Sequence, residues 1–222
     1  MKSGLKQIWV FDLDGTLIDS IGDLNLAANR LLSELGRAPV AIDAMRPMVG
    51  DGVGKLVERV LAARPGPEIG FDEAVARFLG HYEKAPAEAT RPYPGVPETL
   101  AALRNAGCRL AVCTNKPEAV TRLILDRLKL APYFELVIGG DTMPYRKPDP
   151  RLLTVTVERM GAPLDAALMI GDSEVDAATA AAAAVPFVLM TYGYRRGPVE
   201  TIECTAALDR FEALIDLVRT SA

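Results

Sequence analysis

The sequence has only one histidine, His81, among its 222 residues. A zinc site built on several histidines is therefore excluded, and a histidine-based catalytic triad would have to rest on that single residue. The three cysteines, Cys108, Cys113 and Cys204, lack metal-ligand spacing, and their odd number fits a reducing compartment. Any chemistry of this chain is therefore expected to depend on carboxylates, hydroxyls and amines.

A basic surplus is also missing, because 25 Lys and Arg residues stand against 29 Asp and Glu residues, for a net charge of −4. This balance argues against a general nucleic-acid binder and against a protein that binds anionic membranes. No window approaches 18 consecutive apolar residues, and the first apolar run, Ile8 to Phe11, stops at Asp12. Neither a transmembrane helix nor a signal peptide is expected. We expect a cytoplasmic monomer or homodimer without a nucleic-acid or membrane partner.

Half of the residues are hydrophobic, which is enough for a buried core, and many of them fall in short runs. Runs that are apolar at consecutive positions are typical of strands buried on both faces. Helical patterns alternate with the later runs, which predicts an α/β fold with a parallel sheet and right-handed crossovers. The predicted strands are Ile8 to Phe11, Leu110 to Cys113, Leu136 to Ile138, Leu168 to Ile170 and Phe187 to Met190. The predicted helices between them are Val96 to Asn105, Glu118 to Leu130, Pro150 to Met160 and Val175 to Ala184.

The interval between the first two predicted strands is far longer than one crossover needs. It holds three helical patterns, with a glycine-rich turn before the second, and a proline-rich segment closes it. In chain order these are Ile21 to Leu35, the turn Gly50 to Gly54, Lys55 to Ala63, Phe71 to Ala89, and Pro92 to Pro97. We expect residues 18–91 to form a helical insertion in an α/β core made of residues 1–17 and 92–222.

The strongest motif is Asp12-Leu13-Asp14-Gly15-Thr16, directly after the first predicted strand. Ligands of open α/β sheets bind beyond the carboxyl ends of the strands. Residues two apart in an extended segment face the same way, so Asp12 and Asp14 are expected to converge on one point. Two like charges at that distance need a cation, or one of them must hold a proton. The alternative, an Asx turn closed by Gly15, needs only one aspartate.

Three further polar motifs follow predicted strands or precede predicted helices: Thr114-Asn115-Lys116, Lys147-Pro148-Asp149-Pro150, and Gly171 to Asp176. A hydroxyl and backbone N–H groups at a helix N-terminus can bind phosphate, although Thr114 or Asn115 could equally be a plain N-cap. Taken alone, Lys147 could be a surface charge. Ser173 and Asp176 have the spacing of a capping box, whereas Asp172 is not needed for that box and can complete an Mg²⁺ site.

Taken in order, DxDGT, Thr, Lys and GDxxxD resemble the motifs of the haloacid dehalogenase-like hydrolase superfamily, which consists mostly of phosphatases. The resemblance covers essentially the whole chain and implies a Rossmann-like core with an inserted α-helical cap at residues 18–91. It implies that Asp12 is the nucleophile and Asp14 the general acid/base, and that Thr114 and Lys147 bind the phosphoryl group. It also implies a Mg²⁺ ion held by the Asp12 side chain, the Asp14 main-chain carbonyl and Asp172.

Eight further residues are expected in the site or next to it. The expected contacts to substrate or phosphate are Gly15, Thr16, Asn115, Gly50, Gly52 and Lys55. Ser173 and Asp176 are expected to contact the metal ligands and hold them in place without binding the metal themselves.

The proposed roles fit elementary phosphoryl-transfer chemistry. A carboxylate that attacks phosphorus divides hydrolysis into two steps through an aspartyl-phosphate. A second carboxyl group protonates the leaving alkoxide and then deprotonates the attacking water. Mg²⁺ and Lys147 offset the negative charge, so no histidine is required.

Asp14 narrows the reaction type, because the superfamily members that cleave carbon–phosphorus or carbon–halogen bonds lack this second aspartate. Several segments resemble bacterial phosphoglycolate phosphatases, namely FDLDGTLIDS, VGDGVGKLVERVL, YPGV and GDSEVD. This resemblance implies that the ligand is a small phosphorylated metabolite, 2-phosphoglycolate. A sugar-phosphate phosphatase, a β-phosphoglucomutase-like mutase and an inactive binding or chaperone-like member are the alternatives.

The glycine-rich turn in the cap is the segment closest to specificity. Gly50 and Gly52 would allow backbone amides to approach a small carboxylate, or they simply end one helix and start the next. Between them stands Asp51, where the family more often has Asn, and its charge would repel an anionic substrate unless it points away. Lys55 or Arg46 could compensate that charge. A second departure, Ala184 in place of the usual Gly, suggests a less tight turn.

Overall fold

The computed structural model describes residues 7–84 and 87–219, and in these segments six parallel strands form the main sheet. Their spatial order is β5-β4-β1-β6-β7-β8. The strands are β1 (Ile8–Phe11), β4 (Arg109–Cys113), β5 (Leu136–Ile138), β6 (Ala167–Gly171), β7 (Phe187–Met190) and β8 (Ala206–Leu208). The predicted α/β fold with a parallel sheet is therefore confirmed. The short edge strand β8 was missed because its three residues are only partly buried and leave no clear apolar run.

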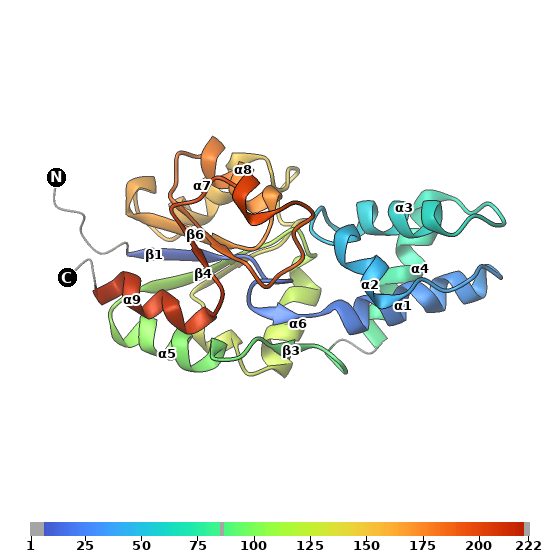
Figure 1. Cartoon of the computed structure of the whole chain (residues 1–222), viewed down its shortest axis with the longest axis horizontal. Helices are drawn as coiled ribbons and strands as arrows, with labels where there is room; N and C mark the ends of the chain where they lie inside the picture. The colour runs from blue at the N-terminus through green and yellow to red at the C-terminus, as the bar shows by residue number, and fades with distance from the viewer. Residues whose placement is uncertain (1–6, 85–86, 220–222) are drawn as a thin grey trace.

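Consecutive residues of the central strands pack on opposite faces of the sheet, which explains the uninterrupted apolar runs. In β1, Trp9 and Phe11 belong to one hydrophobic cluster, and Ile8 and Val10 belong to the other. Figure 1 shows α7 and α8 above the sheet and α5 and α9 below it. The core helices are α5 (Val96–Asn105), α6 (Glu118–Arg127), α7 (Pro150–Arg159), α8 (Glu174–Ala182) and α9 (Leu214–Arg219).

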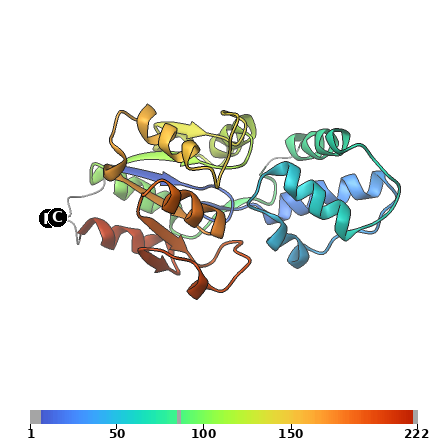
Figure 2. The same cartoon turned by 90° about the horizontal axis from the view of Figure 1, so that it is seen from above.

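The chain leaves and re-enters this core through a two-stranded antiparallel ribbon, β2 (Ile18–Asp19) and β3 (Arg91–Pro92). Between these strands lie α1 (Ile21–Glu34), α2 (Ile42–Met45), α3 (Val53–Ala63) and α4 (Phe71–Lys84). Figures 1 and 2 show this group of helices beyond one end of the sheet. The ribbon stands at the limits expected for the insertion. The division into a core (1–17 and 92–222) and a cap (18–91) stays a prediction. Residues 1–6, 85–86 and 220–222 of these two parts lie outside the residues that the structure describes.

Several predicted helix ends need correction. Helix α3 begins at Val53 rather than at Lys55, directly after Gly52, which has a φ of 90°. Helix α4 ends at Lys84, short of the predicted Ala89. None of the helices in the described parts of the chain has the length and apolar composition that crossing a bilayer requires.

The turn after α8 is as tight as one that contains glycine, so the expectation of a looser turn at Ala184 is wrong. Ala184 adopts a left-handed conformation with a φ of 54°. The N–H of Val185 donates to the carbonyl of Ala180 at 2.9 Å, which closes a Schellman-type helix end. The helix end thus keeps its usual hydrogen bonding at the cost of backbone strain in an alanine.

Candidate active site

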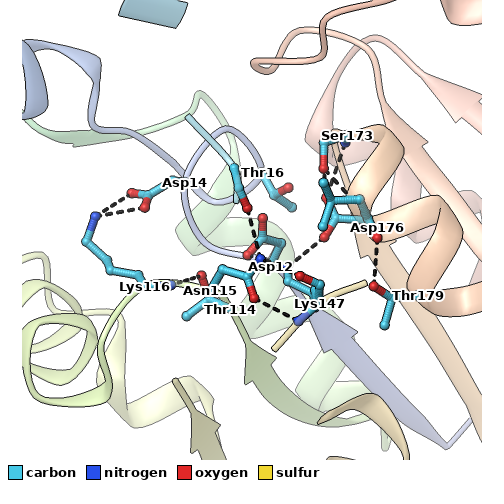
Figure 3. Close-up of polar contacts among 12 residues, drawn as sticks. Asp12, Asp14, Thr16, Thr114, Asn115, Lys116, Lys147, Ser173, Asp176 and Thr179 are labelled. Carbon is cyan, nitrogen blue, oxygen red and sulfur yellow. Dashed lines mark hydrogen bonds and ion pairs between the residues drawn. The ribbon is translucent and has the colours of Figure 1, made fainter. Parts of the chain in front are cut away.

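Three polar side chains from different sequence motifs meet where adjacent strands of the sheet end. Asp12, Thr114 and Asp172 directly follow β1, β4 and β6, which are neighbours in the sheet. The N–H of Asp12 donates to Ile170 at 2.9 Å and so extends the β1–β6 ladder into the site. All three side chains are buried. Asp12 and Thr114 are labelled in Figure 3. The parallel register of the sheet therefore brings together residues that are far apart in the chain.

Lys147 is buried in this cluster rather than exposed as an ordinary surface lysine. Its Nζ lies 2.8 Å from Asp12 Oδ1 and 2.6 Å from Asp176 Oδ1 (Figure 3). Burial alone would lower the pKa of Lys147, but the charges of Asp12 and Asp176 outweigh this effect and raise it. The ammonium group is thus held in its charged form beside Asp12.

The backbone of Lys147 is fixed by Asn115. The Asn115 Nδ2 donates to the Lys147 carbonyl at 2.9 Å, and the Lys147 N–H donates to Asn115 Oδ1 at 2.9 Å. This pair of hydrogen bonds joins the loop after β4 to the loop before α7. Asn115 therefore positions Lys147 and does more than cap a helix.

The expected capping box at the start of α8 is present. Ser173 Oγ accepts from the Asp176 N–H, and Asp176 Oδ2 accepts from both the N–H and the Oγ of Ser173. The other carboxylate oxygen of Asp176, Oδ1, accepts a hydrogen bond from Lys147 Nζ. Asp176 thus links the helix start to the lysine that faces Asp12.

Three buried carboxylates lie close together in the site. Oxygens of Asp12, Asp172 and Asp176 are all within 4.8 Å of one another. Burial raises the pKa of Asp12 to about 6, although Lys147 opposes the rise. Burial, and then the charges of Asp176 and Asp12, raise the pKa of Asp172 well above its usual value. The cluster therefore favours binding of a cation or a proton.

The carboxylate of Asp172 packs directly against the backbone of two glycines, Gly15 and Gly193, and leaves no space for a side chain at either position. It accepts from Thr16 Oγ1 at 2.8 Å and from the Tyr194 N–H at 2.6 Å. A Cβ atom at Gly15 or at Gly193 would overlap this carboxylate, and Gly15 also has a φ of 88°. Glycine is required at both positions for this close approach.

The side chains of Asp12 and Asp14 do not converge on one point, so that expectation is wrong. The chain turns after β1, where the carbonyl of Leu13 accepts hydrogen bonds from the N–H groups of residues 16, 17 and 18. Asp14 consequently faces Lys116, whose Nζ lies 2.9 and 2.7 Å from its two carboxylate oxygens (Figure 3). It also accepts from Ser20 Oγ at 2.6 Å. Asp12 and Asp14 nevertheless line one cavity.

Lys116 is a site residue to which the sequence gave no role of its own. Its side chain is buried, and its Nζ lies 4.7 Å from the centre of the Tyr82 ring on α4. Burial raises the pKa of the Tyr82 hydroxyl to about 12. The position of Lys116, two residues after Thr114, was the available signal, but its partners come from distant segments.

The cavity lies between the cap helices and the ends of the strands, and its empty space is about 540 Å³, solvent opening included. It contains six of the expected residues: Asp12, Asp14, Gly50, Gly52, Thr114 and Asn115. Apolar side chains of the cap, among them Leu24, Leu56 and Phe78, form the opposite wall. Polar groups on the core side that face an apolar wall are the usual lining of a ligand pocket.

Lys55 does not reach this cavity. Its side chain is 59% exposed and pairs with Glu58 at 2.7 Å along α3. The structure therefore does not place Lys55 among the possible ligand contacts, because its position in the first turn of α3 directs it to solvent. The lone histidine is likewise outside the cavity lining, since His81 pairs with Glu34 at 2.9 Å.

Asp51 is neutralised by two arginines, neither of which was expected. It pairs with Arg59 at 2.6 Å and also with Arg196, which comes from the loop after β7. Arg196 in addition donates to the carbonyl of Pro47 at 3.1 Å, and Asn115 donates to the carbonyl of Gly50 at 3.0 Å. These contacts tie the glycine-rich turn to the core and keep the charge of Asp51 compensated.

The chain belongs to the haloacid dehalogenase-like hydrolase family, whose model matches residues 9–190. It is 44% identical to phosphoglycolate phosphatase of Rhodospirillum rubrum over 213 residues, which cover 93% of this chain and 88% of that protein. It is 43% identical to phosphoglycolate phosphatase of Cereibacter sphaeroides, with 95% and 96% of the two chains covered. The crystal structure of a protein described as a predicted phosphoglycolate phosphatase from Haemophilus somnus matches with a TM-score of 0.90 and 29% identity, covering 98% of this chain and 99% of that one.

Proposed function

We propose that this chain is an Mg²⁺-dependent phosphatase that hydrolyses 2-phosphoglycolate to glycolate and phosphate. The observation that carries the proposal is a buried Asp12 carboxylate that lines a small cavity at the ends of the strands, beside Thr114 and a charged Lys147. The similarity to phosphoglycolate phosphatases over nearly the whole chain supports the choice of substrate.

The donor atoms in the site fit Mg²⁺. Asp12 Oδ1 is buried and, among the described residues, has no hydrogen-bond partner beyond its ion pair with Lys147. Carboxylate and carbonyl oxygens are the ligands that Mg²⁺ prefers. We propose that the Asp12 side chain, the Asp14 main-chain carbonyl and Asp172 hold the ion, with Asp176 retained by Lys147 and Ser173. When bound, Mg²⁺ offsets the negative charge of the phosphate and the carboxylates.

In the proposed reaction Asp12 attacks phosphorus while the bond from phosphorus to the glycolate oxygen breaks. Asp14 donates a proton to that oxygen, which leaves as glycolate, and an aspartyl-phosphate forms on Asp12. Asp14 then takes a proton from water as the water attacks phosphorus, and phosphate is released with Asp12 regenerated. Thr114 and Lys147 hold the phosphoryl oxygens and stabilise their charge. We propose that Gly15, Thr16 and Asn115 support this arrangement through the contacts described above.

The lining of the cavity favours a two-carbon leaving group over a sugar. The cap side is formed mostly by apolar side chains such as Leu24, Val53 and Leu56. A sugar phosphate would bring several hydroxyls against this wall, and each would lose hydrogen bonds to water without replacement. Glycolate has one carboxylate to satisfy and little further polar surface.

The experiment is a substrate panel with the purified protein, in Mg²⁺ and in EDTA. The panel contains 2-phosphoglycolate, glucose 6-phosphate, β-glucose 1-phosphate and pyrophosphate. We expect the highest kcat/KM for 2-phosphoglycolate, loss of activity in EDTA, and no turnover by the Asp12→Asn variant. An equal kcat/KM for sugar phosphates would reject the substrate and keep the reaction class. Near-normal turnover by Asp12→Asn would reject the nucleophile.

A further inference from the structure

The polar groups of the cavity that the reaction does not use are concentrated at Lys116 and Tyr82. Lys116 comes from the core, two residues after Thr114, and Tyr82 comes from α4 in the cap. Both line the cavity, and both are buried. They meet at 4.7 Å, measured from the Lys116 Nζ to the centre of the Tyr82 ring. Neither has a part in the transfer of the phosphoryl group as described above.

Lys116 is the only cationic side chain among the described residues that line the cavity, whereas two carboxylates, Asp12 and Asp14, line it. An ammonium group has three N–H donors. Two of them are engaged by the oxygens of Asp14, at 2.9 and 2.7 Å. The third has no acceptor within 3.5 Å among the described residues and lies near the Tyr82 side chain, so it can serve as the charge-assisted donor that a second anionic group would need.

The hydroxyl of Tyr82 is a buried polar atom with no partner within 3.5 Å among the described residues, although the Lys116 ammonium lies close enough to oppose the rise of its pKa. The side chain is 3% exposed, so bulk water does not satisfy it in this arrangement. Leaving a buried hydroxyl unpaired is unfavourable, and a ligand acceptor in the cavity would remove the penalty. This hydroxyl and the Lys116 ammonium together offer two donors at one place, where the apolar cap side of the cavity meets its polar core side.

We propose that Lys116 and Tyr82 bind the carboxylate of the substrate and so select phosphomonoesters that carry a second anionic group close to the phosphate. The proposal rests on the proposed phosphatase function and assigns its specificity to this pair. The carboxylate lies between the core loop and α4, so its binding also holds the cap over the site. A neutral group of the same size would leave the Tyr82 hydroxyl and the third Lys116 N–H without an anionic acceptor.

The test compares 2-phosphoglycolate with 2-hydroxyethyl phosphate, in which a neutral CH₂OH group replaces the carboxylate. For Lys116→Met, the ratio of the two kcat/KM values is expected to fall roughly 10- to 100-fold, the value of one lost charge-assisted hydrogen bond. The variant also deprives Asp14 of its ion pair with Lys116, and this lowers the rates for both substrates alike. The ratio of the two kcat/KM values therefore measures recognition of the substrate carboxylate alone. The loss is expected mainly in KM for 2-phosphoglycolate. Lys84→Met, an exposed lysine at the end of the same helix as Tyr82, is the matched control and should leave the ratio at the wild-type value.

Two further variants keep the test decisive if Lys116→Met does not fold. Lys116→Arg should retain most of the preference for 2-phosphoglycolate, and Tyr82→Phe should reduce the ratio about 3- to 10-fold, as expected for one neutral hydrogen bond. Equal losses on both substrates, with an unchanged ratio, would overturn the assignment and leave Lys116 as a residue that only holds Asp14. A wild-type protein that hydrolyses neither ester would instead reject the proposed function itself.

Discussion

Burial of the Asp12 carboxylate should make the metal-free protein less stable than a variant with a neutral side chain at that position. Burial raises the pKa of Asp12 from 3.8 to about 6. Above pH 6 this rise corresponds to about 3 kcal/mol of lost stability, because the folded state binds the proton more tightly than the unfolded state does. The Asp12→Asn substitution removes that loss. This figure already includes the attraction of Lys147, which lowers the pKa of Asp12, and in the variant Lys147 keeps Asp176 at 2.6 Å.

The expected net effect in EDTA at pH 7.5 is a gain of about 3 kcal/mol, or roughly 6–12 °C in Tm for a chain of this size. The pH dependence has a definite sign. Below about pH 4 the carboxyl is protonated in both states of the wild type, and no stability difference arises from ionisation. Between pH 4 and 6 the wild type loses stability relative to the variant, and above pH 6 the difference is constant.

The measurement is thermal and urea unfolding of both proteins in EDTA from pH 4 to 8, repeated at pH 7.5 with excess Mg²⁺. The ion should narrow the difference, because it stabilises the folded wild type more than the variant. Asp23→Asn is the matched control. Asp23 is equally buried, but it accepts from the N–H of Ala89 at 2.9 Å, and from the N–H and Oγ1 of Thr90 at 2.8 and 2.6 Å. Its replacement should therefore destabilise the protein by about 1–3 kcal/mol.

The reasoning on burial would be refuted if Asp12→Asn were less stable than the wild type in EDTA at pH 7.5. A stability difference that stays flat from pH 4 to 7 would refute it as well. Either result would mean that Lys147 fully compensates the Asp12 carboxylate.

Three further predictions concern positions at which the backbone or a buried charge limits the choice of residue. Ala184→Gly should stabilise the protein by about 0.5–1 kcal/mol in urea unfolding, because it relieves left-handed strain, and Gly161→Ala, at the equivalent position after α7, should have the opposite sign. Gly15→Ala should abolish hydrolysis and weaken Mg²⁺ binding in calorimetry, since its Cβ would displace Asp172; wild-type Mg²⁺ affinity would contradict this. Lys147→Ala should lower kcat about 100-fold or more, and an unchanged kcat would exclude a role of Lys147 in binding the phosphoryl group. The same variant should lower Tm, because it leaves the buried carboxylates of Asp12 and Asp176 without their ion pair.

Much of the fold could be read from the sequence, because strands buried on both faces leave continuous apolar runs. All five predicted strands are present in the sheet. The helix ends were less accurate, since Gly52 and Ala184 act through backbone conformations that side-chain patterns do not report. Strand β8 was missed because an edge strand needs little apolar surface.

The site was partly predictable for a similar reason. Parallel strands end at one edge of the sheet, so residues that follow β1, β4 and β6 must come together, as Asp12, Thr114 and Asp172 do. The direction of Asp14 could not be predicted, because the turn after β1 and the partner Lys116 decide it.

The sequence by itself determined which groups are available, namely carboxylates, a threonine and lysines in place of histidine, and on which strand ends they stand. Only the tertiary structure decided how their charges are paired. Lys147 forms ion pairs with Asp12 and Asp176, and Lys116 forms one with Asp14. Asp51 pairs with Arg59 and Arg196 rather than with the expected Lys55 or Arg46. The physical reason is that spacing along the chain fixes direction only within one regular element, whereas charge pairing depends on distances between elements that packing sets.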